Sequence, residues 1–216
     1  MRSLQSLVAD VRPVRRLLEP SERCARWLGF SLAFLIVGAW LGGVRLDLAE
    51  KSRDASFLLE NGALLMVFAL AARSAFGLSV PNDERPLGTF SLPLVALLLW
   101  LGLVLVRGWR QVDTGAFELA TKTGEACVWR IVILGMPPVF ACWVMLRRAA
   151  PLLRRWVGLF LSLSAFSLAA AGTRALCTID GPLHVLLWHG PPVLLLALAG
   201  GGLGRVVFHD VTSSGR

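Results

Sequence analysis

Long apolar runs alternate with short polar segments along the whole chain. Each run approaches the length of about 20 residues that a helix needs to cross the hydrocarbon core of a bilayer. The second run is the weakest, because Glu60, Asn61 and Arg73 lie near its ends. The pattern predicts an all-α integral membrane bundle of six transmembrane helices, at residues 27–44, 57–76, 90–106, 127–146, 156–176 and 183–208.

The composition supports a membrane protein over a soluble helical domain. Hydrophobic residues make up 56% of the chain and charged residues 17%, and the mean hydropathy is +0.66. A soluble domain would carry roughly a quarter charged residues. Tryptophans also gather at or near the ends of the predicted spans, as expected for side chains that anchor helices at the membrane interface. They are Trp27, Trp40, Trp109, Trp129, Trp156 and Trp188.

The remaining segments are too short for a second domain. We expect residues 1–26 to form a cytoplasmic N-terminal segment, residues 27–208 the transmembrane domain, and residues 209–216 a short cytoplasmic tail. In the N-terminal segment, Leu4, Leu7, Val8 and Val11 follow the spacing of one helix face, which ends before Pro13. Such an amphipathic helix binds in the groove of a partner protein or lies on the bilayer surface, and the spacing fits both.

The orientation follows from the lysines and arginines between the spans. Six precede the first span, Arg73 and Arg85 lie at or after the end of the second, four lie between the fourth and fifth, and Arg205 and Arg216 lie at the C-terminal end. These fourteen are on one side of the membrane, against seven on the other. Because basic residues stay in the cytoplasm, we expect a bacterial inner-membrane protein with both termini cytoplasmic. The net charge of +8 is then explained without a direct nucleic-acid partner.

The sequence offers no familiar catalytic motif. It has no P-loop ending in Lys-Ser/Thr, no His-Glu-x-x-His and no Cys-x-x-Cys. The glycines of residues 200–204 lie in an apolar run, where small residues let helices approach closely. Pro137–Pro138 interrupt the fourth span and Pro191–Pro192 the sixth, and both pairs favour a kink.

The four cysteines are the most informative residues once the topology is imposed. Cys24 lies in the cytoplasmic N-terminal segment (residues 1–26), which we call the lead, and Cys142 lies in the inner half of the fourth span. Cys127 and Cys177 both fall on the outer face, which is oxidising if the host has a periplasm. Cys127 and Cys142 cannot pair, because they are about 22 Å apart along one helix. For the outer pair, a disulfide, a redox switch, a soft-metal site and simple packing all remain open.

The neighbours of the outer cysteines suit reactive thiols. Arg130 lies one helical turn after Cys127, where its charge favours a thiolate. Candidate donors beside Cys177, which with the cysteines could bind a thiophilic metal, are Asp180, His184 and His189. On its own, His184 is better interpreted as a hydrogen-bonding residue at the interface, and Glu60 and Asn61 are expected to be solvated.

Five stretches, in this order along the chain, carry a resemblance to a known family. They are residues 7–17 (LVADVRPVRRL), Cys127 with residues 136–138 (MPP), residues 147–151 (RRAAP), residues 177–180 (CTID), and residues 187–190 (LWHG) before a glycine-rich apolar helix. Together they resemble the negative regulator of sigma-F family of six-span bacterial membrane proteins. The resemblance covers essentially the whole chain and rests on the ordered combination of the stretches.

The resemblance implies an anti-sigma factor without catalytic activity or cofactor. Such a protein holds an extracytoplasmic-function sigma factor at the membrane and releases it under metal or oxidative stress. The paired cysteines of the family would fall on Cys127 and Cys177, whereas Cys24 and Cys142 have no counterpart. Thr178 and residues 181–182 depart from the more acidic loop expected for the family. The resemblance favours a protein partner for the lead, with partner-binding residues Leu4, Leu7, Val8, Val11, Arg12, Arg15 and Arg16.

Two other classes of protein share some of these sequence features. A quinone-linked thiol oxidoreductase also places cysteines on the outer face of a small helical bundle, but it would carry a close Cys-x-x-Cys pair. A small solute transporter would show internal repeats and broken helices around a polar site at the membrane midplane. The proline pairs hint at such breaks, but the sequence contains no repeat.

Reporter fusions test the predicted topology. Fusions after Leu78 and after Phe208 should report the cytoplasm, and fusions near Leu48, Phe117 and Asp180 should report the periplasm, because of the fourteen-to-seven bias in basic residues. A periplasmic C-terminus would contradict the orientation and with it the outward placement of the two cysteines.

Overall fold

The computed structural model describes residues 18–80, 88–110, 124–146, 149 and 151–208. These residues are all helical or in connections, as predicted. The helices are α2 (Pro20–Gly42), α3 (Leu48–Lys51), α4 (Ala55–Gly77), α5 (Ser91–Arg110), α7 (Glu125–Leu146), α8 (Arg154–Arg174), α9 (Pro182–Trp188) and α10 (Gly190–Val207). Six segments are long and apolar enough to cross a membrane, with α9 and α10 together forming the sixth. The prediction of a six-span helical bundle is therefore confirmed.

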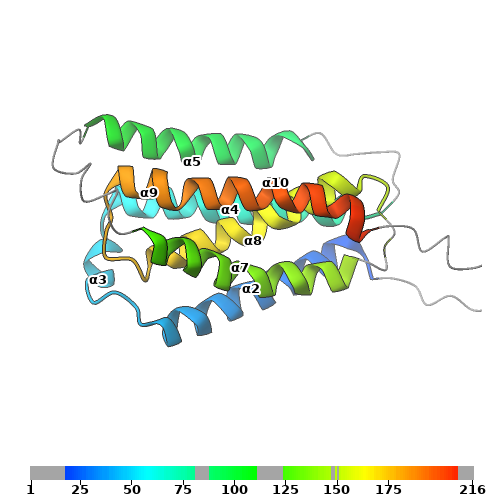
Figure 1. The fold of residues 1–216 in the computed structure, drawn as a ribbon, viewed down its shortest axis with the longest axis horizontal. Coiled ribbons are helices and arrows are strands. Elements are labelled where there is room, and N and C mark those ends of the chain that lie inside the picture. Colours follow the sequence, from blue (N-terminus) through cyan, green and yellow to red (C-terminus); the bar gives the residue numbers. More distant parts are fainter. Residues whose placement is uncertain (1–17, 81–87, 111–123, 147–148, 150, 209–216) are drawn as a thin grey trace, which may run out of the picture.

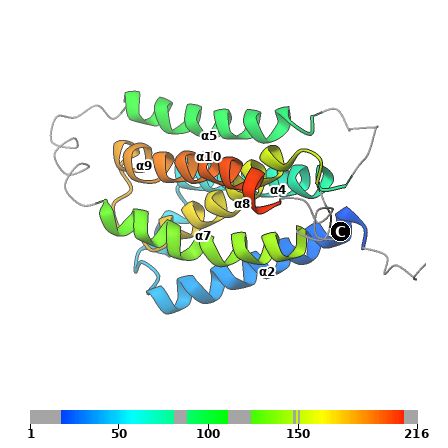
Figure 2. The ribbon, with the colours of Figure 1, turned by 45° about the vertical axis from the view of Figure 1, so that its right-hand side comes forward.

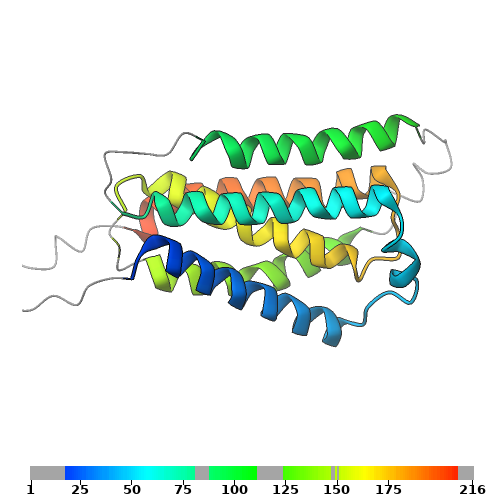
Figure 3. The same ribbon diagram turned by 180° about the vertical axis from the view of Figure 1, so that it is seen from behind.

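The long helices run side by side, and the bundle has two distinct ends (Figures 1 and 3). One end holds α3, α9 and the beginning of α7, and we call it the α9 end. The beginning of α2 and the end of α10 lie together at the opposite end. This arrangement follows from an even number of spans, and it separates the α9 end from the beginning of α2 and the end of α10 by the length of the helices.

Local sequence explains where several helices begin and end. The Asp54 side chain accepts a hydrogen bond of 2.9 Å from the backbone N–H of Ser56, which caps α4. Proline occupies the first turn of α2 and of α9, where its missing N–H costs no hydrogen bond. Gly43 ends α2 with a φ of +78°, a conformation that residues with a side chain rarely adopt.

Helix α8 is the centre of the bundle. It packs against α10, α4, α7 and α2, whereas α5 lies along the outside against α4 and α9 (Figure 2). Sixteen of the 21 residues of α8 are buried. Many of them are small, which allows close packing of helices in a membrane, and Ser164 donates a hydrogen bond of 2.6 Å to the Phe68 carbonyl of α4. Large apolar side chains instead cover the outward faces of the other helices, as on Ile36, Val95, Leu98, Leu195 and Leu198.

Glycines bring α8 and α10 into backbone contact. A Cβ atom added to Gly204 would lie 2.5 Å from the Arg154 carbonyl oxygen, and one added to Gly158 would collide with the Gly200 carbonyl. Both approaches are to backbone atoms, which cannot swing aside. The interpretation of the glycine-rich run as a close packing face is therefore confirmed.

Trp27 lies in the interior and not at the membrane interface. It is 1% exposed, packs on the rings of Phe68 and Phe76, and donates a hydrogen bond of 2.9 Å to the Pro138 carbonyl. The prediction of an interfacial belt was therefore wrong for Trp27, whereas Trp109 is 85% exposed as expected. The indole links α2 to α7 beside the proline pair of α7.

The two proline pairs act differently. Pro137 and Pro138 lie inside α7, which continues through them to Leu146. Pro191 and Pro192 lie in the first turn of α10, and the sixth span breaks two residues before Pro191, at His189. The imidazole of His189, at this break, is fully buried.

Candidate functional site

Cys127 and Cys177, which are 50 residues apart in sequence, meet at the α9 end with their sulfur atoms 3.4 Å apart. Both are buried. Cys127 lies in the first turn of α7. Cys177 follows the end of α8 and is held to it by a backbone hydrogen bond of 2.9 Å to the Thr173 carbonyl. The structure therefore brings together the two cysteines that the topology had placed on one face.

Two histidines complete the cluster. The Nε2 atom of His184, in α9, lies 3.5 Å from the sulfur of Cys127 and 3.5 Å from that of Cys177. His189, at the break between α9 and α10, has its ring centroid 5.7 Å from that of His184. One donor atom from each of the four residues lies within 4.8 Å of the other three. His184 is 1% exposed, so its interpretation as an interfacial residue was wrong.

The surroundings of Cys177 favour its thiolate. The hydrogen bond from the Cys127 thiol, followed by that from His184, lowers the pKa of Cys177 below its usual value against the opposing effect of burial. Arg130, expected to act on the thiols through its charge, donates a hydrogen bond of 3.1 Å to the carbonyl of Leu176, directly before Cys177. The connection that carries this thiol is thereby fixed to α7 as well as to α8.

Asp180 lies beside the cluster but outside it. Its carboxylate accepts a hydrogen bond of 2.9 Å from Arg174 and pairs with Lys51 at 3.3 Å. The four-residue cluster of possible metal ligands accordingly does not include it. Asp180 was a candidate metal ligand, but its carboxylate oxygens are paired with Arg174 and Lys51.

Glu60 is the functional residue that sequence reasoning missed. It is 1% exposed, and its carboxylate pairs with Arg174 of α8 at 2.7 Å and with Arg107 of α5 at 3.1 Å. The prediction that Glu60 is solvated was therefore wrong. A signal was available, because a carboxylate within a span needs a partner and both arginines end predicted spans on the same face.

The ion pairs and the thiol cluster share one connection. Arg174 closes α8 three residues before Cys177, and Arg107 donates a hydrogen bond of 2.7 Å to the backbone carbonyl of Asp180 three residues after it. The position of Cys177 is thus set from both sides by arginines that are anchored on Glu60.

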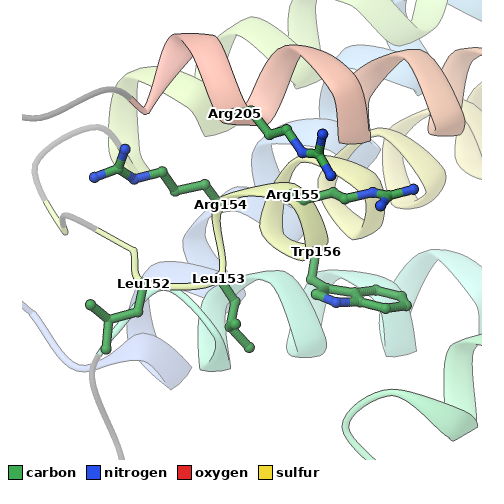
Figure 4. Close-up of a pocket in the computed structure, with 6 residues that line it drawn as sticks. All are labelled: Leu152, Leu153, Arg154, Arg155, Trp156 and Arg205. Carbon is green, nitrogen blue, oxygen red and sulfur yellow. The ribbon is translucent and has the colours of Figure 1, made fainter.

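The opposite end of the bundle carries a basic hollow (Figure 4). Its lining comes from the beginning of α8, the residues before it and the end of α10: Leu152, Leu153, Arg154, Arg155, Trp156 and Arg205. The predicted partner-binding residues of the lead, from Leu4 to Arg16, lie outside the described residues. Cys24 and Cys142 are buried in α2 and α7.

Comparison with known proteins gives one match. A family model described as "Negative regulator of sigma F" matches residues 7–209, nearly the whole chain. No curated protein and no solved structure matches.

Removal of Arg174 should destabilise the folded protein. We expect Arg174→Leu to lower the free energy of unfolding by about 3–5 kcal/mol, because it leaves the buried Glu60 carboxylate short of a counter-charge. The measurement is thermal or denaturant unfolding of the purified protein in detergent. As a control, Arg26→Leu removes the exposed ion pair with Glu22 and should cost less than about 1 kcal/mol. Equal stability of the two variants would contradict a structural role for the ion pairs.

Proposed function

The chain belongs to the negative regulator of sigma F family, and we propose that it holds an extracytoplasmic-function sigma factor at the bacterial inner membrane and releases it under metal or oxidative stress. Membership of the family makes it an anti-sigma factor with a sigma factor as partner. The six apolar helices make it a multi-pass membrane protein. The proposal adds the class of sigma factor, the signal and the residues that sense it, and assigns the chain no catalytic activity of its own.

The contact between Cys127 and Cys177 carries the proposal. Their sulfur atoms are 3.4 Å apart, although Cys127 lies in α7 and Cys177 in the connection that follows α8. A disulfide between them would shorten this distance to about 2.05 Å and so pull the beginning of α7 toward the end of α8. The thiolate is the form of cysteine that reacts with oxidants and soft metals. The hydrogen bond from Cys127 favours the thiolate of Cys177.

The structure offers a physical route from the thiols to the lead. Cys127 begins α7, and the Pro138 carbonyl in the same helix accepts the hydrogen bond from Trp27 of α2. Trp27 is the eighth residue of α2, near the N-terminal end of that helix. A tilt of α7 at its proline pair would move the indole and with it the helix that carries the lead.

The basic end of the bundle is a suitable surface for binding the sigma factor. If both termini are cytoplasmic, as the basic bias predicts, the hollow with Arg154, Arg155 and Arg205 (Figure 4) lies on the side of the membrane where the sigma factor would bind. The sensing cysteines and the surface that binds the sigma factor would then lie at opposite ends of the bundle, with the cysteines facing the oxidising periplasm.

Charges placed on the apolar face of the lead should weaken binding. We expect Leu7→Glu or Val8→Glu to reduce co-purification of the sigma factor by about tenfold or more, because a buried Leu or Val contributes about 1.5–3 kcal/mol. Promoters that depend on the sigma factor should be derepressed while membrane insertion stays normal. Unchanged binding in both variants would place the contact elsewhere, for instance at residues 147–155.

The two outer cysteines should act as one unit. Cys127→Ser and Cys177→Ser should show the same altered response of a sigma-dependent reporter to cadmium, chromate or a thiol oxidant, and the double variant should resemble either single one. The reason is that each substitution removes one side of the same sulfur pair. Cys142→Ser, a control on the same helix, should respond like the wild type. Normal sensing by both single variants would contradict the proposal.

A further inference from the structure

We propose that Cys127, Cys177, His184 and His189 bind one thiophilic divalent metal ion, such as Zn²⁺ or Cd²⁺, in a closed tetrahedral site. The binding itself requires no sigma factor. Its regulatory role, in which the metal fixes α7 against α9 and α10, rests on the function proposed above.

The distances already fit such an ion. A tetrahedral centre with metal–sulfur bonds of about 2.3 Å and metal–nitrogen bonds of about 2.0–2.1 Å separates its ligand atoms by roughly 3.3–3.8 Å. The sulfur atoms are 3.4 Å apart, and the Nε2 atom of His184 is 3.5 Å from each of them. The fourth donor, from His189, lies within 4.8 Å of the other three, so a small rotation of one imidazole completes the site.

The imidazole of His189 lacks a partner that would otherwise explain its position. Its two ring nitrogens are buried and make no hydrogen bond with the described residues, and the same holds for Nδ1 of His184. A buried polar atom left without a partner costs about 1–3 kcal/mol. A metal ion in the cluster would satisfy one nitrogen of His189, which is fully buried at the break in the sixth span.

The donor set selects for soft metals. Two sulfurs and two imidazole nitrogens suit Zn²⁺ and other thiophilic ions, whereas Mg²⁺ and Ca²⁺ require oxygen ligands. The nearby carboxylates of Glu60 and Asp180 are paired with arginines and with Lys51. They are therefore not available as ligands.

Charge balance also favours a divalent ion at this buried place. On binding, each thiol loses one proton as its sulfur–metal bond forms, so that two protons are released per ion. Two thiolates, two neutral imidazoles and one divalent cation carry no net charge. A neutral complex avoids the large cost of burying an unpaired charge.

Metal titration of the purified full-length chain tests the site directly. The reduced protein in detergent is titrated with Cd²⁺ and followed by the ultraviolet charge-transfer band of cadmium thiolates, and Zn²⁺ is followed by competition. We expect one ion per chain in the wild type. His184→Asn and His189→Asn should each weaken binding by at least about tenfold, and Cys127→Ser should remove about half of the thiolate band. Circular dichroism of each variant checks that the helices are retained.

Matched controls are the residues of the same types outside the cluster. Cys142→Ser and His209→Asn, which changes the third of the three histidines in the chain, should bind like the wild type. One ion bound with unchanged affinity in both histidine variants would overturn the ligand set. No binding by the reduced wild type would overturn the site, even if the reporter response still required both cysteines, as a disulfide switch would. Metal binding as predicted, without any effect on sigma factor retention, would support the site and contradict the proposed function.

Discussion

The pairing of Glu60 with Arg174 and Arg107 determines the geometry of the α9 end. A single carboxylate within a span is costly in a low-dielectric surrounding, and it persists only where cations compensate it. Here the cations come from α8 and α5, so that the same contact joins three helices. Both arginines also bind Asp180. The short connection that contains Cys177 is therefore held in place by Arg174 and Arg107. Because this connection has little conformational freedom, the thiol of Cys177 stays against Cys127.

Helix α8 and helix α7 contribute to the site in different ways. Helix α8 is buried along most of its length, and its glycines touch the backbone of α10. Because a packed interior resists gradual deformation, α8 serves as a fixed reference for Cys177. Helix α7 carries Cys127 at one end and the proline pair at its middle, and proline removes the hydrogen bonds that would stiffen the helix there. Of the two helices that bear the thiols, α7 is therefore the one built to move.

The sequence predicted the spans and the placement of Cys127 and Cys177 at one end of the bundle, since hydrophobic run length and basic bias depend on residue type alone. It did not predict which residues face each other across helices. Glu60 and Trp27 were both assigned to polar or interfacial surroundings from their places near span ends, but each has its partner on another helix. His189 escaped a firm assignment for a related reason. The proline pair predicted an interruption of the sixth span, but not that His189 at this interruption would lie beside Cys127 of α7.

The free energy of metal binding at the α9 end determines whether it can control a binding surface at the opposite end of the bundle. Reversal of a two-state equilibrium from 1:99 to 99:1 takes about 5.5 kcal/mol of differential binding energy. Structural zinc sites with four ligands supply about 10–16 kcal/mol at neutral pH, so half of that energy suffices if only one tilt of α7 allows all four ligands to bind. The Trp27 hydrogen bond to the Pro138 carbonyl then carries the tilt to α2. Because that bond joins buried groups, it would move with α7 instead of exchanging with water, and the helix that bears the lead would follow.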